Sequence, residues 1–122
     1  MKPRRWRQLR SASSRGNHSH HVYVVLLDSK VRELARVRAE NPDANPNLPC
    51  VYVGMTGLQP EDRFENHRQG IKSSYYVRKF GCRLLPELYE YLNPMPYEAA
   101  QQMEGDLAED LRSQGYTVTG GH

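Results

Sequence analysis

The chain has 122 residues and a formal net charge of +3, with 38% hydrophobic and 25% charged residues, which predicts one domain of ordinary soluble composition. The longest apolar run, residues 22–27, is too short for a membrane-spanning helix, and the N-terminus lacks the apolar segment of a secretory signal. We therefore expect a cytoplasmic protein that does not bind membranes. Cys50 and Cys82 have no CxxC partner, so we expect reduced thiols in the core rather than a zinc site or a disulfide.

Basic charge is concentrated at the N-terminus. Residues 1–20 contain six Lys or Arg residues and no acid, so the remaining chain carries 11 basic and 14 acidic residues. With few large apolar side chains, this stretch predicts a basic flexible arm, followed by a folded domain over 21–122. Such an arm could bind nucleic acid or be a simple disordered tail. His18, His20 and His21 are potential metal ligands, although close histidine groups in flexible segments are commonly incidental.

A strand and a helix are the first predicted elements. Residues 21–27 read HVYVVLL and are apolar on both alternating faces, which is typical of a central strand. Asp28 or Ser29 can then cap a helix over 30–40. The following segment, 41–49, has three prolines and three asparagines and predicts a loop that returns the chain to the next strand.

The second strand and the second helix carry polar residues of interest. We expect a strand over 50–53, with Gly54 permitting a tight exit from it. A proline at the start and a glycine after the end delimit a helix over 60–69. On a helical wheel, Arg63 and His67 lie about 40° apart along one edge of the inward face. Both side chains are therefore expected at the boundary of the core.

The segment that follows is basic and aromatic. We expect a short helix over 73–80, and a third strand within 82–92 that is an edge strand or stops early at Pro86. Between residues 63 and 83 there are six basic side chains and one acid, interleaved with aromatic rings. This composition fits a nucleic-acid surface, and a solvated helix face is the alternative. The residues expected to contact nucleic acid are Arg68, Lys72, Tyr75, Arg78 and Lys79.

The last predicted helix, 97–113, contains one carboxylate on the wrong face. Glu104 falls inside the apolar sector of the helical wheel, and the other acids lie at least about 120° away on the opposite face. A carboxylate that points toward the core needs a partner, because burying it unpaired is costly. A salt bridge to Arg63 or another arginine and a bound metal ion are both open interpretations.

Four motifs in order resemble those of the GIY-YIG nuclease family, in particular its small stand-alone bacterial members. These are a tyrosine in the first strand (HVYVV), a second tyrosine before glycine (VYVG), a helix with Arg-x-x-x-His (RFENH), and a lone inward glutamate in a later helix (AAQQMEGDLAEDL). The resemblance implies an α/β fold with a small three-stranded antiparallel sheet flanked by helices. The helix over 30–40 would be an insertion between strands 1 and 2. It also implies one divalent metal ion, Mg²⁺ or Mn²⁺, held by the glutamate.

The same resemblance assigns roles to residues. Tyr23 would be the general base or its relay, Tyr52 would position water or phosphate, and Arg63 would stabilise charge on the phosphorus. Glu104 would hold the metal. The residues that match the family's functional positions are Tyr23, Tyr52, Gly54, Arg63, His67 and Glu104. The chain departs from the family pattern in having His21 at the first signature glycine and 28 residues between the two tyrosines.

We therefore expect a metal-dependent endonuclease that hydrolyses DNA phosphodiester bonds. RNA and branched DNA are further substrates consistent with the pattern, and the expected oligomeric state is a monomer or a weak homodimer. The alternative is a catalytically inactive nucleic-acid-binding module of the same fold. A third hypothesis is an interaction domain that uses the acidic face of the 97–113 helix.

Overall fold

The computed structural model describes residues 17–121, so the predicted basic arm lies almost entirely outside the described residues. The domain is a four-stranded sheet in the order β3-β1-β2-β4. The strands are β1 (His21–Leu27), β2 (Cys50–Thr56), β3 (Gly81–Leu84) and β4 (Thr117–Gly120). β1 pairs antiparallel with both β2 and β3, whereas β4 runs parallel to β2. The mixed α/β class is confirmed.

The predicted three-stranded antiparallel sheet is wrong in strand number and direction. The fourth strand has only four residues, two of them threonines, and pairs with a strand more than sixty positions earlier in the chain. Gly115, at a positive φ of 106°, turns the chain after the last helix and sends it back beside β2. Such short, non-local pairing leaves little trace in a local hydrophobic pattern.

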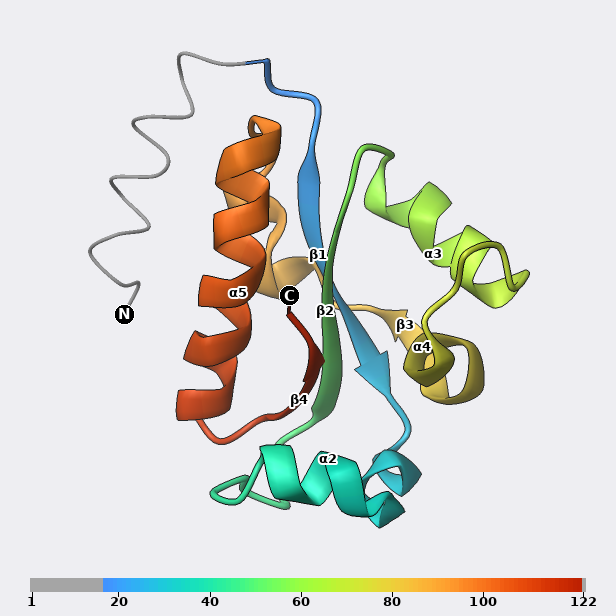
Figure 1. The fold of residues 1–122 in the computed structure, drawn as a ribbon, viewed down its shortest axis with the longest axis vertical. Helices are drawn as coiled ribbons and strands as arrows, with labels where there is room; N and C mark the ends of the chain where they lie inside the picture. The colour runs from blue at the N-terminus through green and yellow to red at the C-terminus, as the bar shows by residue number, and fades with distance from the viewer. Residues whose placement is uncertain (1–16, 122) are drawn as a thin grey trace.

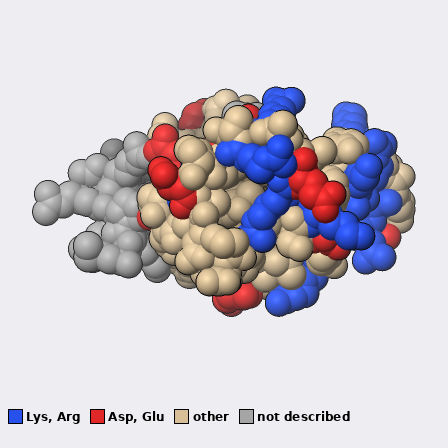
Figure 2. Space-filling model, turned by 90° about the horizontal axis from the view of Figure 1, so that it is seen from below, with Lys and Arg blue, Asp and Glu red and all other residues tan. Residues whose placement is uncertain are grey.

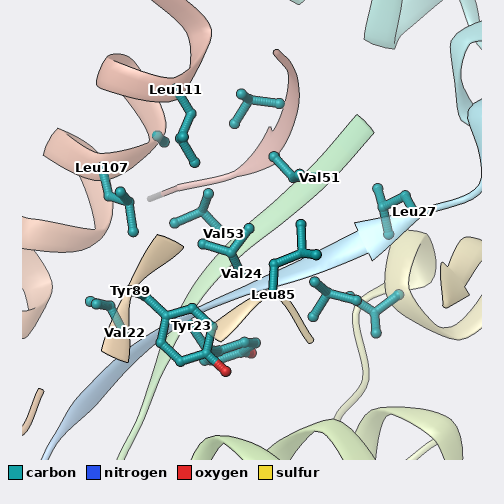
Figure 3. Close-up of a cluster of buried hydrophobic side chains, with 14 of the residues drawn as sticks. Val22, Tyr23, Val24, Leu27, Val51, Val53, Leu85, Tyr89, Leu107 and Leu111 are labelled. Atoms are coloured by element: carbon teal, nitrogen blue, oxygen red, sulfur yellow. The ribbon is translucent and has the colours of Figure 1, made fainter. Parts of the chain in front are cut away.

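Helices cover both faces of the sheet (Figure 1). The long helix α5 (Tyr97–Ser113) packs on one face, while α3 (Pro60–Arg68) and α4 (Tyr75–Phe80) lie on the other. Leu107 and Leu111 point from α5 toward the strands that carry Val24 and Val53 (Figure 3). The helices predicted over 60–69, 73–80 and 97–113 are thus confirmed, within two residues at each end. Within residues 17–121, no helix has the length and apolar character needed to cross a membrane.

The helical insertion between β1 and β2 is broken into two pieces. It consists of a 3₁₀ helix, η1 (Ser29–Glu33), and the short helix α2 (Ala35–Glu40), separated by Leu34 in an extended conformation. The Asp28 side chain accepts a hydrogen bond from the Lys30 amide at 2.8 Å, as its predicted capping role requires. Arg38 donates from Nη1 to the carbonyl oxygens of residues 32 and 33, so the carbonyls freed by the break are satisfied.

The segment after β3 closes the outer edge of β1. β3 stops at Leu84, before Pro86, and the 3₁₀ helices η2 (Pro86–Leu88) and η3 (Glu90–Leu92) follow, which confirms the early stop expected from the proline. The Asn93 side chain then accepts from the Val22 amide at 2.9 Å and donates to the Val22 carbonyl at 2.8 Å. A side chain thus replaces a strand where β3 has ended. Cys50 and Cys82 are free thiols. Cys50 is buried as expected, but the expected core position is wrong for Cys82, which is exposed on the edge strand β3.

The sequence predicts that Gly54 ends its strand, and this prediction is wrong. β2 continues to Thr56, and Gly54 lies inside it directly opposite Tyr23 of β1. A Cβ atom on Gly54 would lie 2.6 Å from both Cζ and Oη of the Tyr23 ring. The glycine is therefore needed because the tyrosine ring lies across it, and not because the chain turns there.

We predict that Gly54→Ala destabilises the fold by about 1–3 kcal/mol, since the new methyl group displaces a buried ring. In a Tyr23→Leu background, which lacks the two clashing atoms, the same substitution should have a much smaller effect. Urea denaturation of wild type, the two single variants and the double variant gives the coupling free energy between the two substitutions. Gly105→Ala is the matched control, because the nearest atom to its Cβ is 3.7 Å away, an ordinary contact. Equal effects of Gly54→Ala in both backgrounds would contradict this role of the glycine.

Candidate active site

Two tyrosines lie side by side on the sheet face that α3 and α4 cover. Tyr23 of β1 is paired with Gly54, and Tyr52 of β2 is paired with Val25, so the alternation of the strands sends both rings to the same face. Their centroids are 6.2 Å apart. Tyr23 is only 1% exposed, whereas Tyr52 is partly open to solvent. The pair therefore has one buried hydroxyl and one at the rim.

His67 from α3 joins the two tyrosines. Its ring centroid lies 6.0 Å from that of Tyr23 and 5.8 Å from that of Tyr52, and its side chain is fully buried. The Ser74 amide donates to His67 Nδ1 at 3.1 Å, and Nε2 lies 2.8 Å from the Tyr23 hydroxyl. Because Nδ1 accepts, the proton of the neutral ring is on Nε2, which donates to the Tyr23 oxygen. Backbone geometry thus fixes the tautomer.

The fixed tautomer determines what His67 and Tyr23 can do. Burial, with a smaller effect of the Arg63 charge, lowers the pKa of His67 to about 4, so the ring is neutral near pH 7. Its one lone pair is occupied by the Ser74 amide, so His67 is suited to positioning rather than to proton abstraction. Burial raises the pKa of Tyr23 well above its ordinary value, while the positive charge of Arg63 opposes the rise. The hydroxyl therefore keeps its own proton, available to a bound group.

Arg63 is held in place by the loop between α3 and α4. It donates from Nη1 to the Ile71 carbonyl at 3.1 Å and from Nη2 to the Lys72 carbonyl at 2.8 Å. Its positive charge opposes the rise in the pKa of Tyr23 and of Tyr52 and contributes to the low pKa of His67, so all three groups lie within its electrostatic reach. The two loop carbonyls fix one edge of the guanidinium fork, and its side chain is only partly buried. Arg63 thus lies at the boundary of the core as expected, whereas the same prediction is wrong for His67, which is fully buried because its ring packs between the two tyrosines.

Glu104 reaches the site from the opposite face of the sheet. The Val53 carbonyl accepts a hydrogen bond from the Gly121 amide at 2.9 Å, just after the end of β4. Backbone groups two residues apart in a strand point the same way, so the Met55 amide points to the same edge of β2, beyond the last residue of β4. That amide hydrogen-bonds the Glu104 carboxyl. The side chain is 6% exposed, and burial raises the pKa of the carboxyl to about 7. The inward orientation predicted from the helical wheel is confirmed.

Within the part of the chain that the structure describes, the salt bridge considered for Glu104 does not form. Among residues 17–121 the ion pair that the structure contains is Arg36–Glu40, at 3.7 Å on the surface. Glu104 nevertheless raises the pKa of both Tyr52 and Tyr23, which are the same groups that Arg63 acts on. A cation and a carboxylate thus border the tyrosine pair without neutralising each other. Such an arrangement can bind an anion at one end and a cation at the other.

Glu104 suits a metal site in which the protein supplies one carboxylate and water or substrate supplies the other ligands. In the described part of the chain, no group of three or more His, Cys, Asp or Glu residues is arranged to hold a metal ion, which applies also to His18, His20 and His21. Mg²⁺ commonly keeps several waters and binds through one or two carboxylates together with substrate phosphate oxygens. Glu104, a buried carboxylate with no cationic partner among the described residues, fits such a site. A site built from protein ligands alone does not fit.

The five residues expected to contact nucleic acid are all exposed. They lie on the last turn of α3, in the loop after it, and on α4: Arg68, Lys72, Tyr75, Arg78 and Lys79. Lys and Arg side chains gather at the end of the molecule that carries these helices (Figure 2). The surface adjoins the site directly, because Ser74 bonds His67 and Tyr75 is the next residue.

Ser74 is the site residue that sequence reasoning missed. Its amide sets the His67 tautomer, its Oγ accepts from the Tyr76 amide at 3.2 Å as the N-cap of α4, and its side chain lowers the pKa of Tyr52 through a hydrogen bond. A serine before a short helix signals a cap. Nothing in the local pattern indicates that the same residue contacts a histidine seven positions earlier.

Comparisons of the chain with models of protein families, with curated proteins and with solved structures return no match. The assignment of the site therefore depends on its geometry and on the motif order.

We predict that Ser74→Pro, but not Ser74→Ala, releases the His67 tautomer. Both substitutions remove the cap hydroxyl, but only proline removes the amide proton, and the Ser74 φ of −70° is one that proline adopts. Because this bond favours the neutral ring, its loss raises the pKa of His67 above about 4, while burial and the Arg63 charge still hold it below its ordinary value. NMR titration of ¹⁵N-histidine-labelled protein measures the pKa of His67, and the His67→Gln variant identifies its signals. Identical titrations for the two variants would rule out the tautomer lock.

A second prediction concerns Glu104 and pH in metal-free protein. The unfolded carboxyl ionises near 4.5 and the folded one near 7, so stability falls as pH rises through this window. Glu104→Gln removes this ionisation. Relative to wild type it should gain up to about 3 kcal/mol between pH 4 and pH 8. Urea denaturation measures the gain, and Glu98→Gln, exposed on the same helix, is the control. A difference that does not change with pH would contradict the burial of the Glu104 charge.

Proposed function

We propose that this protein is a metal-dependent endonuclease of the GIY-YIG type that hydrolyses DNA phosphodiester bonds. One observation carries the proposal: Arg63 and Glu104 border a buried Tyr23–His67 pair from two sides without pairing with each other. A phosphodiester needs a cation for its anionic oxygens, and a carboxylate that remains unpaired can hold a metal ion.

The side chains divide the reaction between them. Arg63, with its fork fixed by two loop carbonyls, binds the phosphate and stabilises the extra negative charge that develops on it. Tyr23, protonated at neutral pH, donates a hydrogen bond to the phosphate or to the attacking water. It takes up the proton of that water only where base from solvent has first removed its own, and the hydrogen bond from His67 and the Arg63 charge stabilise the phenolate so formed. Tyr52, at the rim, positions the attacking water or a phosphate oxygen. Mg²⁺ or Mn²⁺ bound by Glu104 would supply a Lewis acid for the leaving oxygen.

The substrate side of the proposal depends on the basic surface. Arg68, Lys72, Arg78 and Lys79 provide cations beside the site, and contacts with phosphates gain affinity by releasing counterions. We infer a cytoplasmic enzyme that acts as a monomer or a weak homodimer on DNA, with RNA and branched DNA as further substrates to test.

A nucleic-acid-binding module without catalysis is the second candidate. The observation in its favour is that Tyr23 is 1% exposed with its pKa raised, so the hydroxyl is protonated at neutral pH. Such a module would bind DNA in a salt-dependent way without any metal requirement. Its binding would be lost with Arg78→Ala and Lys79→Ala, and no cleavage would accompany it.

Cleavage of plasmid and branched DNA with Mg²⁺ or Mn²⁺ distinguishes the two candidates. We predict that Glu104→Ala and Arg63→Ala each lower the cleavage rate by about 10²–10³-fold, which is the usual effect of removing one group that stabilises the transition state. Glu98→Ala and Arg36→Ala, at exposed positions away from the site, should leave the rate unchanged. Absence of cleavage by the wild type, or equal cleavage by all four variants, would reject the nuclease and leave the binding module.

A further inference from the structure

Tyr75 is an exposed aromatic ring in a fixed orientation. It is the first residue of α4 and is 46% exposed. Two neighbouring rings meet it nearly at right angles, Tyr76 at 5.7 Å and 71° and Phe80 at 6.2 Å and 81°. Perpendicular aromatic contacts of this kind stabilise a ring orientation. The ring is thus held in place by rings that leave nearly half of the residue accessible.

The charged residues of α4, the helix that Tyr75 begins, are both basic. Lys79 places Nζ over the Tyr75 ring, 5.7 Å from its centroid, Arg78 is exposed three residues further along the helix, and the six residues of α4 contain no acid. A planar aromatic surface beside ammonium and guanidinium groups matches a nucleotide, which offers a planar base and an anionic phosphate.

The ring is also coupled to the candidate active site. Tyr75 follows Ser74, whose amide bonds His67, and the preceding loop is bonded to Arg63 through the carbonyls of Ile71 and Lys72. These bonds fix the start of α4 against the groups proposed to bind the phosphate. A base that stacks on Tyr75 therefore belongs to a nucleotide close to the bond to be cleaved.

We propose that Tyr75 stacks an unpaired nucleobase, so that the substrate is DNA with unpaired nucleotides next to the cleaved bond. In a duplex both faces of a base are covered by its neighbours, and only an unstacked base can lie on a protein ring. This inference depends on the proposed function for the place of the cleaved bond, but the stacking itself is a binding property. Single strands, bubbles and flaps are the substrates it favours over uninterrupted duplex.

The test compares binding to three DNAs of one sequence: a blunt duplex, the same duplex with a central bubble, and a single strand. Binding is measured by fluorescence anisotropy in EDTA, which removes divalent metal ions and so prevents cleavage. Wild type should bind bubble and single strand roughly tenfold or more tightly than duplex, and Tyr75→Ala should weaken that binding roughly 5- to 150-fold while leaving duplex binding unchanged. Tyr75→Phe, which keeps the ring, should behave as wild type. A 2-aminopurine in the bubble should be quenched by wild type and Tyr75→Phe, and not by Tyr75→Ala.

Tyr97→Ala is the matched control, because Tyr97 is 49% exposed but lies on α5. The proposal is overturned if wild type does not prefer unpaired DNA, if Tyr97→Ala weakens binding as much as Tyr75→Ala, or if Tyr75→Phe fails as Tyr75→Ala does. Cleavage of the same bubble with Mg²⁺ separates the two proposals. If binding requires the Tyr75 ring but the bubble is not cleaved, only the proposed nuclease function is rejected. If the bubble is cleaved but binding does not depend on the Tyr75 ring, only the proposed stacking is rejected.

Discussion

The hydrogen-bond chain from the Ser74 amide through His67 to Tyr23 is the constraint on which the rest of the site depends. A fully buried imidazole and a buried phenol are tolerated only if their polar atoms are paired, and each satisfies the other here. The chain joins β1, α3 and the start of α4, which are far apart in sequence. It also places Arg63 and the basic surface in fixed positions relative to the sheet, because both belong to the same helix and loop.

The site also depends on the pairing of β1 with β2. Their register puts Tyr23 opposite the one residue of β2 without a side chain, and the ring occupies the space that a Cβ would fill. A slip of one residue between the two strands would leave the two tyrosines on opposite faces of the sheet. Strand register, glycine position and imidazole tautomer are therefore parts of one arrangement.

Local patterns in the sequence were sufficient for much of this molecule. The first strand follows from a continuous apolar run, the helix over 60–69 from the proline and glycine at its ends, and the inward orientation of Glu104 from helical periodicity. All three signals come from neighbours in sequence. The features that were missed are set by distant residues: the parallel pairing of β4, the contact of Gly54 with a ring on another strand, and the amide of Ser74 on a histidine ring. The break at Leu34 was missed because the bonds that stabilise it come from a side chain in the next turn.

The point at which β4 ends has a consequence for the position of Glu104. Gly120 and Gly121 have positive φ values of 75° and 86°, so the chain bends away and the Met55 amide remains for Glu104. Residues without this backbone freedom would favour an extended continuation along β2, and a main-chain carbonyl would then compete with the carboxylate for that amide. Lengthening of β4 would therefore displace Glu104 from the candidate site with every side chain of that site retained. The backbone at the sheet edge, and not only the motif residues, thus determines whether Glu104 has its amide partner.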